Sequence, residues 1–210
     1  MLNAIKKHGF TLAAFALAST GLVAVTHSLT ESRIEQQQNA QLKNLLNQVF
    51  PSQLHDNALF KNCYIFSAPF VKSGEQLHSY RATLNGEYSG VVLETLASDG
   101  YNGRIKVIVG VNSQGDVTGT RVVEHSETPG LGDKVDYRIT HWVDSFIGKH
   151  WSSENDATWQ VRKDGGSFDQ FTGATITPRA VVKSVRNILV YLEKHKDEIT
   201  TSPANCGDIQ

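Results

Sequence analysis

The start of the chain carries one long apolar stretch. No Asp, Glu, Lys or Arg occurs from residue 8 to residue 30, and a helix of this length would cross the ~30 Å hydrocarbon layer of a membrane. The pattern predicts a transmembrane helix over residues 9–30, because a core helix of a soluble protein would turn a charged face toward water. A cleaved signal peptide is the alternative, although its apolar core usually has only ~7–15 residues.

The charges on the two sides of this stretch differ. Lys6 and Lys7 precede it, whereas charges of both signs follow it. Positive charge on the short N-terminal side is typical of a cytoplasmic end. We therefore expect residues 1–8 in the cytoplasm, the apolar segment in the cytoplasmic (inner) membrane, and the main domain on the periplasmic or extracytoplasmic side.

Helical spacing of apolar residues continues beyond the apolar stretch. It predicts a helical stalk over residues 31–50 that lies against the folded domain, and Pro51 marks its end. The apolar positions of this stalk are Ile34, Leu42, Leu45, Leu46 and Val49. The remaining residues, 51–210, suffice for one domain of ordinary size.

Two antiparallel hairpins are predicted inside that domain. The first turns at Asn85-Gly86, the commonest signal for a two-residue hairpin turn. In the second, apolar residues alternate over 105–111 and the chain returns over 117–125 after a glycine-containing turn. This alternation predicts a strand with one buried face.

Three further segments have weaker patterns. Residues 63–68 and 158–162 have the composition of short strands, and residues 135–147 have mixed helical spacing. The apolar side of the last segment consists of Trp142, Val143 and Phe146.

The final helix has the clearest helical pattern. Thr177 is a suitable N-cap, and Pro178 stands at the first helical position, where proline is tolerated. An apolar stripe then follows at helical spacing. The stripe consists of Val181, Ser184, Val185, Ile188, Leu189 and Leu192. Together these patterns predict an α+β domain of antiparallel hairpins with packed helices, behind an N-terminal transmembrane helix.

Charge and cysteine content narrow the function classes. The chain has 20 basic and 21 acidic residues and no basic block, which argues against nucleic-acid binding. Cys63 and Cys206 lie far apart and have no metal-type spacing. If the domain is exported, a disulfide could join the C-terminal tail to the body, and two independent thiols are the alternative.

Two glycine-containing loops are the candidates for chemistry. Residues 124–132 directly follow a strand, and Pro129, Gly130 and Gly132 let the backbone approach a planar ligand closely. His125 borders this loop and is the only histidine that we single out. Taken alone, such a loop is usually a plain turn.

The second loop, residues 169–178, ends at the predicted start of the final helix. Thr172, Thr175 and Thr177 place three hydroxyls around Gly173, and a helix N-terminus stabilises a phosphate. Such threonines usually serve only as helix caps. The loop is not a P-loop, and the chain has neither a G-x-S-x-G elbow nor a histidine pair at metal spacing.

These segments together resemble a known family. Tyr101-Asn102-Gly103, the hairpin over 104–123 and the loop over 124–132 look like the FMN-binding domain of flavoprotein electron carriers. The similarity covers roughly residues 90–190.

The second loop adds a more specific likeness. Asp169-x-x-Thr172-Gly173-Ala174-Thr175 resembles the tag at which a flavin transferase attaches FMN to threonine. Within the family, the layout with an N-terminal anchor is most similar to the G subunits of the Rnf ion-translocating electron transport complex. The C subunits of the sodium-translocating NADH:quinone reductase are the nearest alternative.

The resemblance implies one FMN, held by a phosphoester bond to Thr175 after transfer from FAD. It implies electron exchange with other membrane subunits of the Rnf-type complex, which couples electron flow between ferredoxin and NAD to ion movement. Leu131 would pack on one face of the ring, and backbone N–H groups would face its polar edge. The other implied binding residues are Thr172, Gly173, Ala174, Thr177, Glu127, Thr128, Gly130 and Gly132.

Two competing hypotheses remain at this point. The chain could bind FMN without a covalent bond, or it could be a membrane-tethered binding or scaffolding domain with no redox role. The joint presence of both loops favours the covalent flavoprotein.

Overall fold

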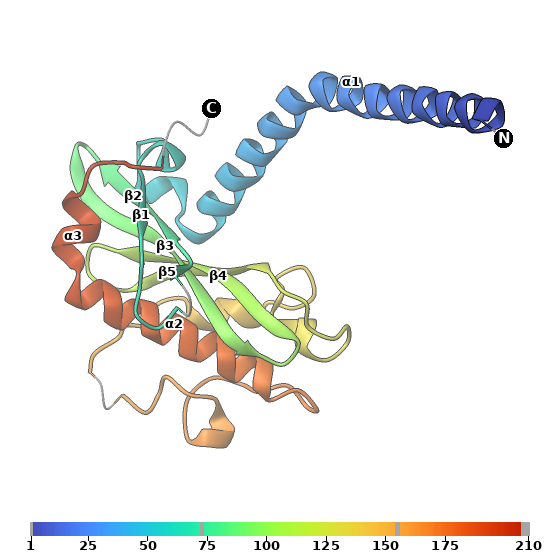
Figure 1. Cartoon of the computed structure of the whole chain (residues 1–210). Coiled ribbons are helices and arrows are strands. Elements are labelled where there is room, and N and C mark those ends of the chain that lie inside the picture. The colour runs from blue at the N-terminus through green and yellow to red at the C-terminus, as the bar shows by residue number, and fades with distance from the viewer. Residues whose placement is uncertain (1, 72–73, 154–155, 207–210) are drawn as a thin grey trace. The chain divides into compact units, whose positions relative to one another are not determined.

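The strands of the domain pair in the order in which they occur along the chain. The computed structural model describes residues 2–71, 74–153 and 156–206. It contains a five-stranded antiparallel sheet with the order β1-β2-β3-β4-β5 (Figure 1). The strands are β1 (Cys63–Phe66), β2 (Leu77–Leu84), β3 (Glu87–Gly100), β4 (Gly103–Asn112) and β5 (Val117–Glu124).

Helices precede and follow this sheet. They are α1 (Leu2–Val49), α2 (Ile176–Lys194) and α3 (Lys196–Thr201). Short 3-10 helices occur in the connections, at Ser52–Leu54, Leu59–Lys61, Gly132–Val135, Trp142–Phe146 and Arg162–Asp164. The predicted α+β class is confirmed.

Both predicted hairpins are present. Asn85 and Gly86 have φ values of 54° and 82°, the left-handed pair that a type I′ turn requires. The strand after this turn is long, because β3 continues to Gly100 and pairs with β4 from Gly90 onward.

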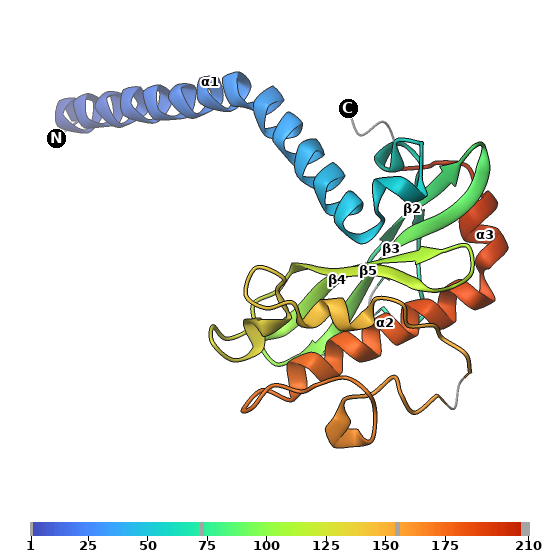
Figure 2. The ribbon, with the colours of Figure 1, turned by 180° about the vertical axis from the view of Figure 1, so that it is seen from behind.

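Side chains from both faces of the sheet are buried, which corrects the prediction of a single buried face. One face packs against α2, which lies along the sheet in both views (Figures 1 and 2). Its strand residues include Leu77, Val91, Leu93, Ile105, Val107, Val109 and Val111. The opposite face meets the last turns of α1 through Tyr80, Ala82, Val92 and Ile108.

Glycines let the end of α1 approach the sheet closely. Gly110 and Gly119 face each other across β4 and β5. A Cβ atom on Gly119 would lie 2.7 Å from the Cα atom of Val49. The Thr118 hydroxyl donates a hydrogen bond of 2.6 Å to the Val49 carbonyl. The predicted stalk therefore packs against the domain at its C-terminal end, whereas Ile34 is exposed.

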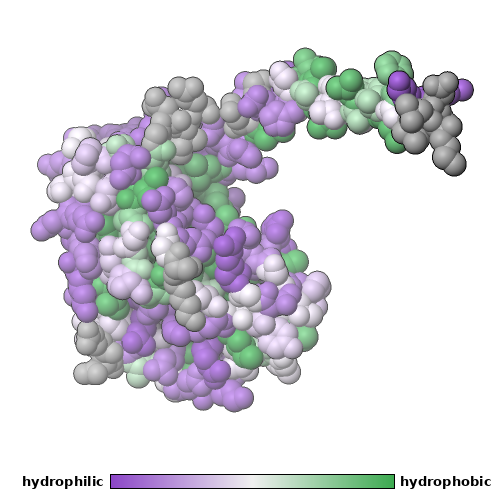
Figure 3. Space-filling view, in the orientation of Figure 1, coloured by the Kyte–Doolittle hydropathy of each residue, from purple (hydrophilic) through white to green (hydrophobic). Residues whose placement is uncertain are grey.

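Residues 2–41 form a separate compact unit, and the second unit begins at Leu42. Within the first unit, Lys6–Glu31 is long and apolar enough to cross a membrane, by length and composition. Apolar side chains cover this part of the helix (Figure 3). The segment includes the predicted span 9–30.

One local prediction between β5 and α2 is wrong. Residues 158–162 form no strand but only an isolated bridge between Val161 and Phe168. Residues 135–147 contain the end of one 3-10 helix and the whole of the next, Trp142–Phe146. The ring of Phe146 lies 4.4 Å from that of Phe168, so packing between distant aromatic residues decides the local structure here.

The two cysteines are joined and are not independent thiols. Cys63 and Cys206 form a disulfide across a sequence separation of 143 residues, with Cα atoms 5.6 Å apart. It joins the C-terminal tail to β1.

We predict that Gly119→Ala destabilises the domain by about 1–3 kcal/mol, because the new methyl group overpacks the contact with Val49. In an open strand the same change would stabilise by about 0.4–1 kcal/mol through the unfolded state. Urea unfolding of the full chain in detergent measures the difference. Gln114→Ala, at an exposed turn position of the same hairpin, is the control. Equal or higher stability of Gly119→Ala would contradict the close contact.

Candidate functional site

The two loops singled out from the sequence meet at one hollow beside the start of α2. Its volume is about 240 Å³. We call it the α2 hollow. It is lined by Tyr101, Glu127, Thr128, Leu131, Gly132, Gly173, Ala174, Thr175, Ile176 and Thr177. Of the predicted binding residues, Thr172 and Gly130 lie outside this lining.

The first loop is closed by its own backbone. The N–H groups of Leu131 and Gly132 both donate to the Thr128 carbonyl at 3.1 Å. These two N–H groups are therefore engaged within the loop. Gly130 has a φ of 77°, a conformation that suits glycine. Leu131 remains 42% exposed and presents an apolar side chain to the hollow.

The second loop makes a tight turn before α2. Gly173 has a φ of 79°, and the Ala174 N–H donates to the Phe171 carbonyl at 3.0 Å. Thr175 is half-buried and stands at the N-cap position, whereas Thr172 is exposed. The turn thus brings the Thr175 side chain to the α2 hollow and leaves Thr172 outside it.

The helix begins two residues earlier than predicted. Its first residue is Ile176, so Thr177 is not the N-cap and Pro178 lies within the first turn. Pro178 is still tolerated, because N–H groups of the first turn have no partner within the helix. The Arg179 N–H already donates to the Thr175 carbonyl at 3.3 Å. A phosphate at this helix start would therefore meet the N–H groups ahead of Arg179.

The Thr177 hydroxyl binds across the hollow instead of capping the helix. It donates a short hydrogen bond to Oε2 of Glu127, and both residues are buried. Oε1 of the same carboxylate accepts the Asn102 N–H at 3.0 Å. Glu127 therefore connects the β3–β4 turn, the first loop and the start of α2.

Glycine makes this junction possible. A Cβ atom on Gly132 would lie 2.7 Å from both Glu127 Oε2 and Thr177 Oγ1. A Cβ atom on Gly100 would lie 2.9 Å from Glu127 Oε1. Either side chain would displace the carboxylate, so Gly132 is needed for close packing rather than for ligand access alone.

His125 has a structural role at the edge of the first loop. Its Nδ1 atom accepts the Glu127 N–H at 3.2 Å, and its Nε2 atom lies 3.5 Å from Oδ2 of Asp136. Hydrogen bonds from Arg138 lower the pKa of Asp136 to about 2. Asp136 therefore stays ionised at neutral pH and holds the histidine in place.

The charged side chains near the second loop are paired. Arg179 binds Asp164 with two hydrogen bonds of 2.7 and 2.8 Å. Asp169, the acidic residue of the tag, lies 3.1 Å from Arg162. The start of α2 adds positive potential at Thr175.

Two lining residues were missed by the sequence analysis. Tyr101 lies in the β3–β4 turn and is 69% exposed, and Ile176 is 46% exposed. Tyr101 belongs to the segment that resembles the FMN-binding domain, and an aromatic residue in a hairpin turn was the available signal. No local signal distinguished Ile176, because its place depends on where the helix begins.

Comparison with known proteins gives the family. Residues 100–190 match the model of the FMN-binding domain, and residues 1–49 match that of the RnfG N-terminal region. The G subunit of the ion-translocating oxidoreductase complex of Vibrio atlanticus (strain LGP32) is 55% identical over 207 residues, covering 99% of each chain. The chain belongs to this family of G subunits. The likeness extends over the whole chain rather than over the domain alone.

Other members of the family are similar to this chain over nearly its full length. The corresponding G subunits of Vibrio parahaemolyticus serotype O3:K6 and Aliivibrio fischeri (strain MJ11) are 54% and 52% identical. The first alignment covers 100% of each chain, and the second covers 98% of this chain and 99% of its relative. The described part of the chain has one candidate span, at residues 6–31, and together with this membership it supports a single-pass membrane protein.

The residues of the α2 hollow fit FMN. A half-buried hydroxyl stands at a helix start, where a phosphate is stabilised. Tyr101, Leu131 and Ile176 offer exposed apolar surface to a ring. The volume of about 240 Å³ is below the ~300–1,000 Å³ of pockets that enclose drug-sized ligands. The hollow would therefore hold a flavin only in part.

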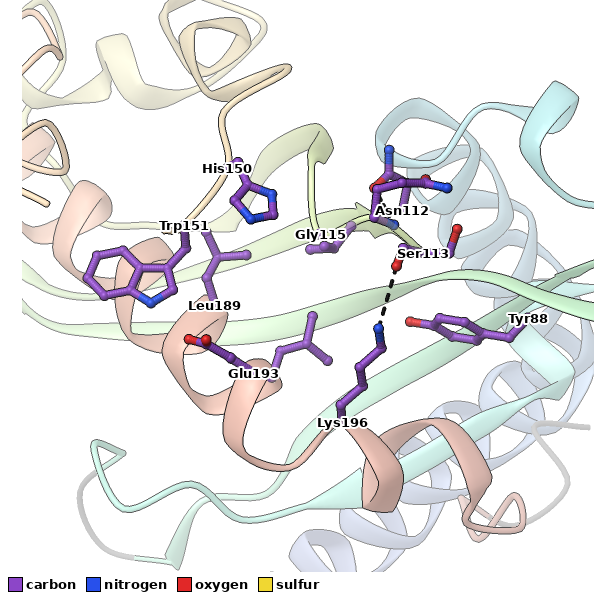
Figure 4. A pocket seen from close by; sticks show the side chains of 12 residues that line it. Tyr88, Asn112, Ser113, Gly115, His150, Trp151, Leu189, Glu193 and Lys196 are labelled. Carbon is purple, nitrogen blue, oxygen red and sulfur yellow. Dashed lines mark hydrogen bonds between the residues drawn. The ribbon is translucent and has the colours of Figure 1, made fainter. Parts of the chain in front are cut away.

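A second hollow lies at the opposite end of α2 (Figure 4). Its volume is about 180 Å³, and the residues around it include the β4–β5 turn, Trp151 and Leu189. The Lys196 ammonium group donates to the Ser113 carbonyl across it at 3.5 Å. None of the residues predicted to bind FMN lines this hollow.

We predict that Thr177→Val destabilises the domain by about 1–3 kcal/mol, because it leaves a buried carboxylate oxygen without its donor. Valine keeps the shape of the side chain, so a cavity would not explain the loss. Thermal or urea unfolding of the full chain measures the effect. Thr172→Val, at an exposed position of the same loop, is the control, and equal stability of the two variants would show that the bond contributes nothing.

Proposed function

We propose that this chain is an electron-transfer subunit of an ion-translocating ferredoxin:NAD oxidoreductase complex and carries one FMN covalently on Thr175. The position of the Thr175 hydroxyl supports this most directly. It lies in the α2 hollow, beside the start of a helix and opposite the first loop. The names of the relatives support a place in such a complex.

The proposed attachment balances as a group transfer from FAD. The Thr175 oxygen forms a bond to the phosphorus of the FMN moiety, the phosphoanhydride bond of FAD breaks, and AMP leaves. The hydroxyl proton is released to solvent or to a base of the flavin transferase. Gly173 and Thr172 are exposed, so the tag is open to that separate enzyme.

A covalent bond suits a shallow hollow. A tether keeps its ligand at high effective concentration even when the other contacts are weak. The bound flavin supplies the redox chemistry, and the protein positions it and leaves part of it open to partner subunits. Ion movement belongs to those other subunits in this proposal, because residues 8–30 contain no charged side chain other than histidine.

We further propose that residues 1–8 are cytoplasmic and that the domain lies outside the cytoplasmic membrane. Lys6 and Lys7 precede the apolar segment, as expected for a cytoplasmic end. The disulfide between Cys63 and Cys206 supports the same orientation, since such bonds persist in oxidising compartments.

We expect the purified chain, expressed with the flavin transferase, to have the mass of the polypeptide plus FMN minus one water. Thr175→Ala should lose the flavin completely on acid precipitation, because alanine has no oxygen for the phosphoester. Thr175→Ser, which keeps a hydroxyl, is the matched control. Intact mass spectrometry decides the assignment, and stoichiometric covalent flavin on Thr175→Ala would refute it.

Acid precipitation also distinguishes the alternatives. Yellow wild-type protein that releases its flavin in trichloroacetic acid would indicate non-covalent FMN. Colourless wild-type protein from cells with an active transferase would indicate a binding domain with no redox role.

For the orientation, we expect proteinase K added to spheroplasts to digest the domain and leave a small membrane fragment with an N-terminal epitope. The membrane shields only the cytoplasmic end in this arrangement. Inverted vesicles should give the opposite pattern. A full-length chain that survives in intact spheroplasts and is cut in inverted vesicles would reverse the topology.

A further inference from the structure

Glu127 is a buried carboxylate without the cationic partner that the buried carboxylates Glu94 and Asp136 have. It is 4% exposed, and no ion pair of Glu127 occurs within residues 2–71, 74–153 and 156–206. By contrast, Glu94 pairs with Lys106 at 3.0 Å and Asp136 pairs with Arg138 at 2.5 Å. The Glu127 carboxylate thus has hydrogen-bond donors but no cation beside it.

Both oxygens of Glu127 have a hydrogen-bond partner. Oε1 accepts the Asn102 N–H, and Oε2 accepts the Thr177 hydroxyl. An ionised carboxylate can accept both of these hydrogen bonds. Thr177 belongs to the first turn of α2, whose positive dipole end is also the place proposed for the phosphate.

From this arrangement we propose that the charge of Glu127 lowers the reduction potential of the flavin held in the α2 hollow. The proposal rests on the function proposed above. Reduction adds negative charge to the ring, and a buried carboxylate in the wall of the same hollow opposes that change. Burial strengthens the effect, because water screens the charge poorly there. A lower potential makes the reduced carrier a stronger electron donor.

No bond to Glu127 forms or breaks in this role. The electrons come from the donor subunit in the complex, or from dithionite in a titration, and they leave to the acceptor subunit. Glu127 acts only through its charge and through the two groups that it holds in place.

Glu127→Gln removes the charge and can preserve the geometry. The amide oxygen can accept the Asn102 N–H, and the amide NH₂ group can donate to the Thr177 hydroxyl oxygen. Glu124→Gln is the matched control, because Glu124 lies three positions earlier and its side chain is 61% exposed. Water screens a charge at that position.

The test is a dithionite titration, with redox mediators, of the full-length flavin-loaded protein in detergent. We expect Glu127→Gln to raise the midpoint potential by at least a tenfold change in the two-electron equilibrium, about 30 mV. Glu124→Gln should stay at the wild-type potential. Equal potentials for wild type and a fully loaded, folded Glu127→Gln would overturn the proposal, and so would an equal rise in both variants.

A second pair of variants applies if Glu127→Gln does not fold. Thr128→Lys places a cation in the lining of the hollow beside Glu127, whereas Ser126→Lys places it at an exposed position on the other side. Only Thr128→Lys should raise the potential, and equal potentials in this pair would overturn the inference. Wild-type protein without any flavin would instead refute the proposed function, so the two failures are distinguishable.

Discussion

The hydrogen bond between the Thr177 hydroxyl and the buried Glu127 carboxylate holds the site together. It joins the start of α2 to a loop fifty residues earlier in the chain, and the same carboxylate also holds the β3–β4 turn through Asn102. A buried carboxylate is costly unless its oxygens are satisfied. This requirement brings three segments together, and the α2 hollow lies where they meet.

Close packing of α1 and α2 against the sheet holds the segments of this junction in place. The stripe of α2 is buried against one face, and the last turns of α1 are buried against the other. Gly110 and Gly119 allow the α1 contact because they have no side chain. A helix start positioned by such a core moves little, and a phosphate site needs that rigidity because backbone N–H groups must point at one place.

In the proposed function, different features of the hollow retain the flavin, orient its ring and set its reduction potential. At about 240 Å³ the hollow is smaller than the ~300–1,000 Å³ of pockets that enclose drug-sized ligands, and it offers exposed apolar side chains. In the proposed function, the bond to Thr175 provides retention and the rim orients the ring. The buried charge of Glu127 then adjusts how readily the ring accepts electrons. The same carboxylate would thus build the site and set its redox behaviour.

Local patterns in the sequence determined the apolar N-terminal segment, the turn at Asn85-Gly86 and the buried stripe of α2. Each depends on neighbouring residues alone, through length, turn chemistry or helical period. The two loops were also found from short motifs, and both line one hollow in the structure.

Only the tertiary structure decided where α2 begins, what covers the second face of the sheet and which residues complete the hollow. Thr177 has the chemistry of an N-cap, but a distant carboxylate competes for its hydroxyl and the helix starts at Ile176. Tyr101 joins the site because Glu127 holds its turn. Residues 158–162 form no strand, and Trp159 packs against Phe168 instead. In each case the deciding partner is far away in sequence, where a local pattern contains no information about it.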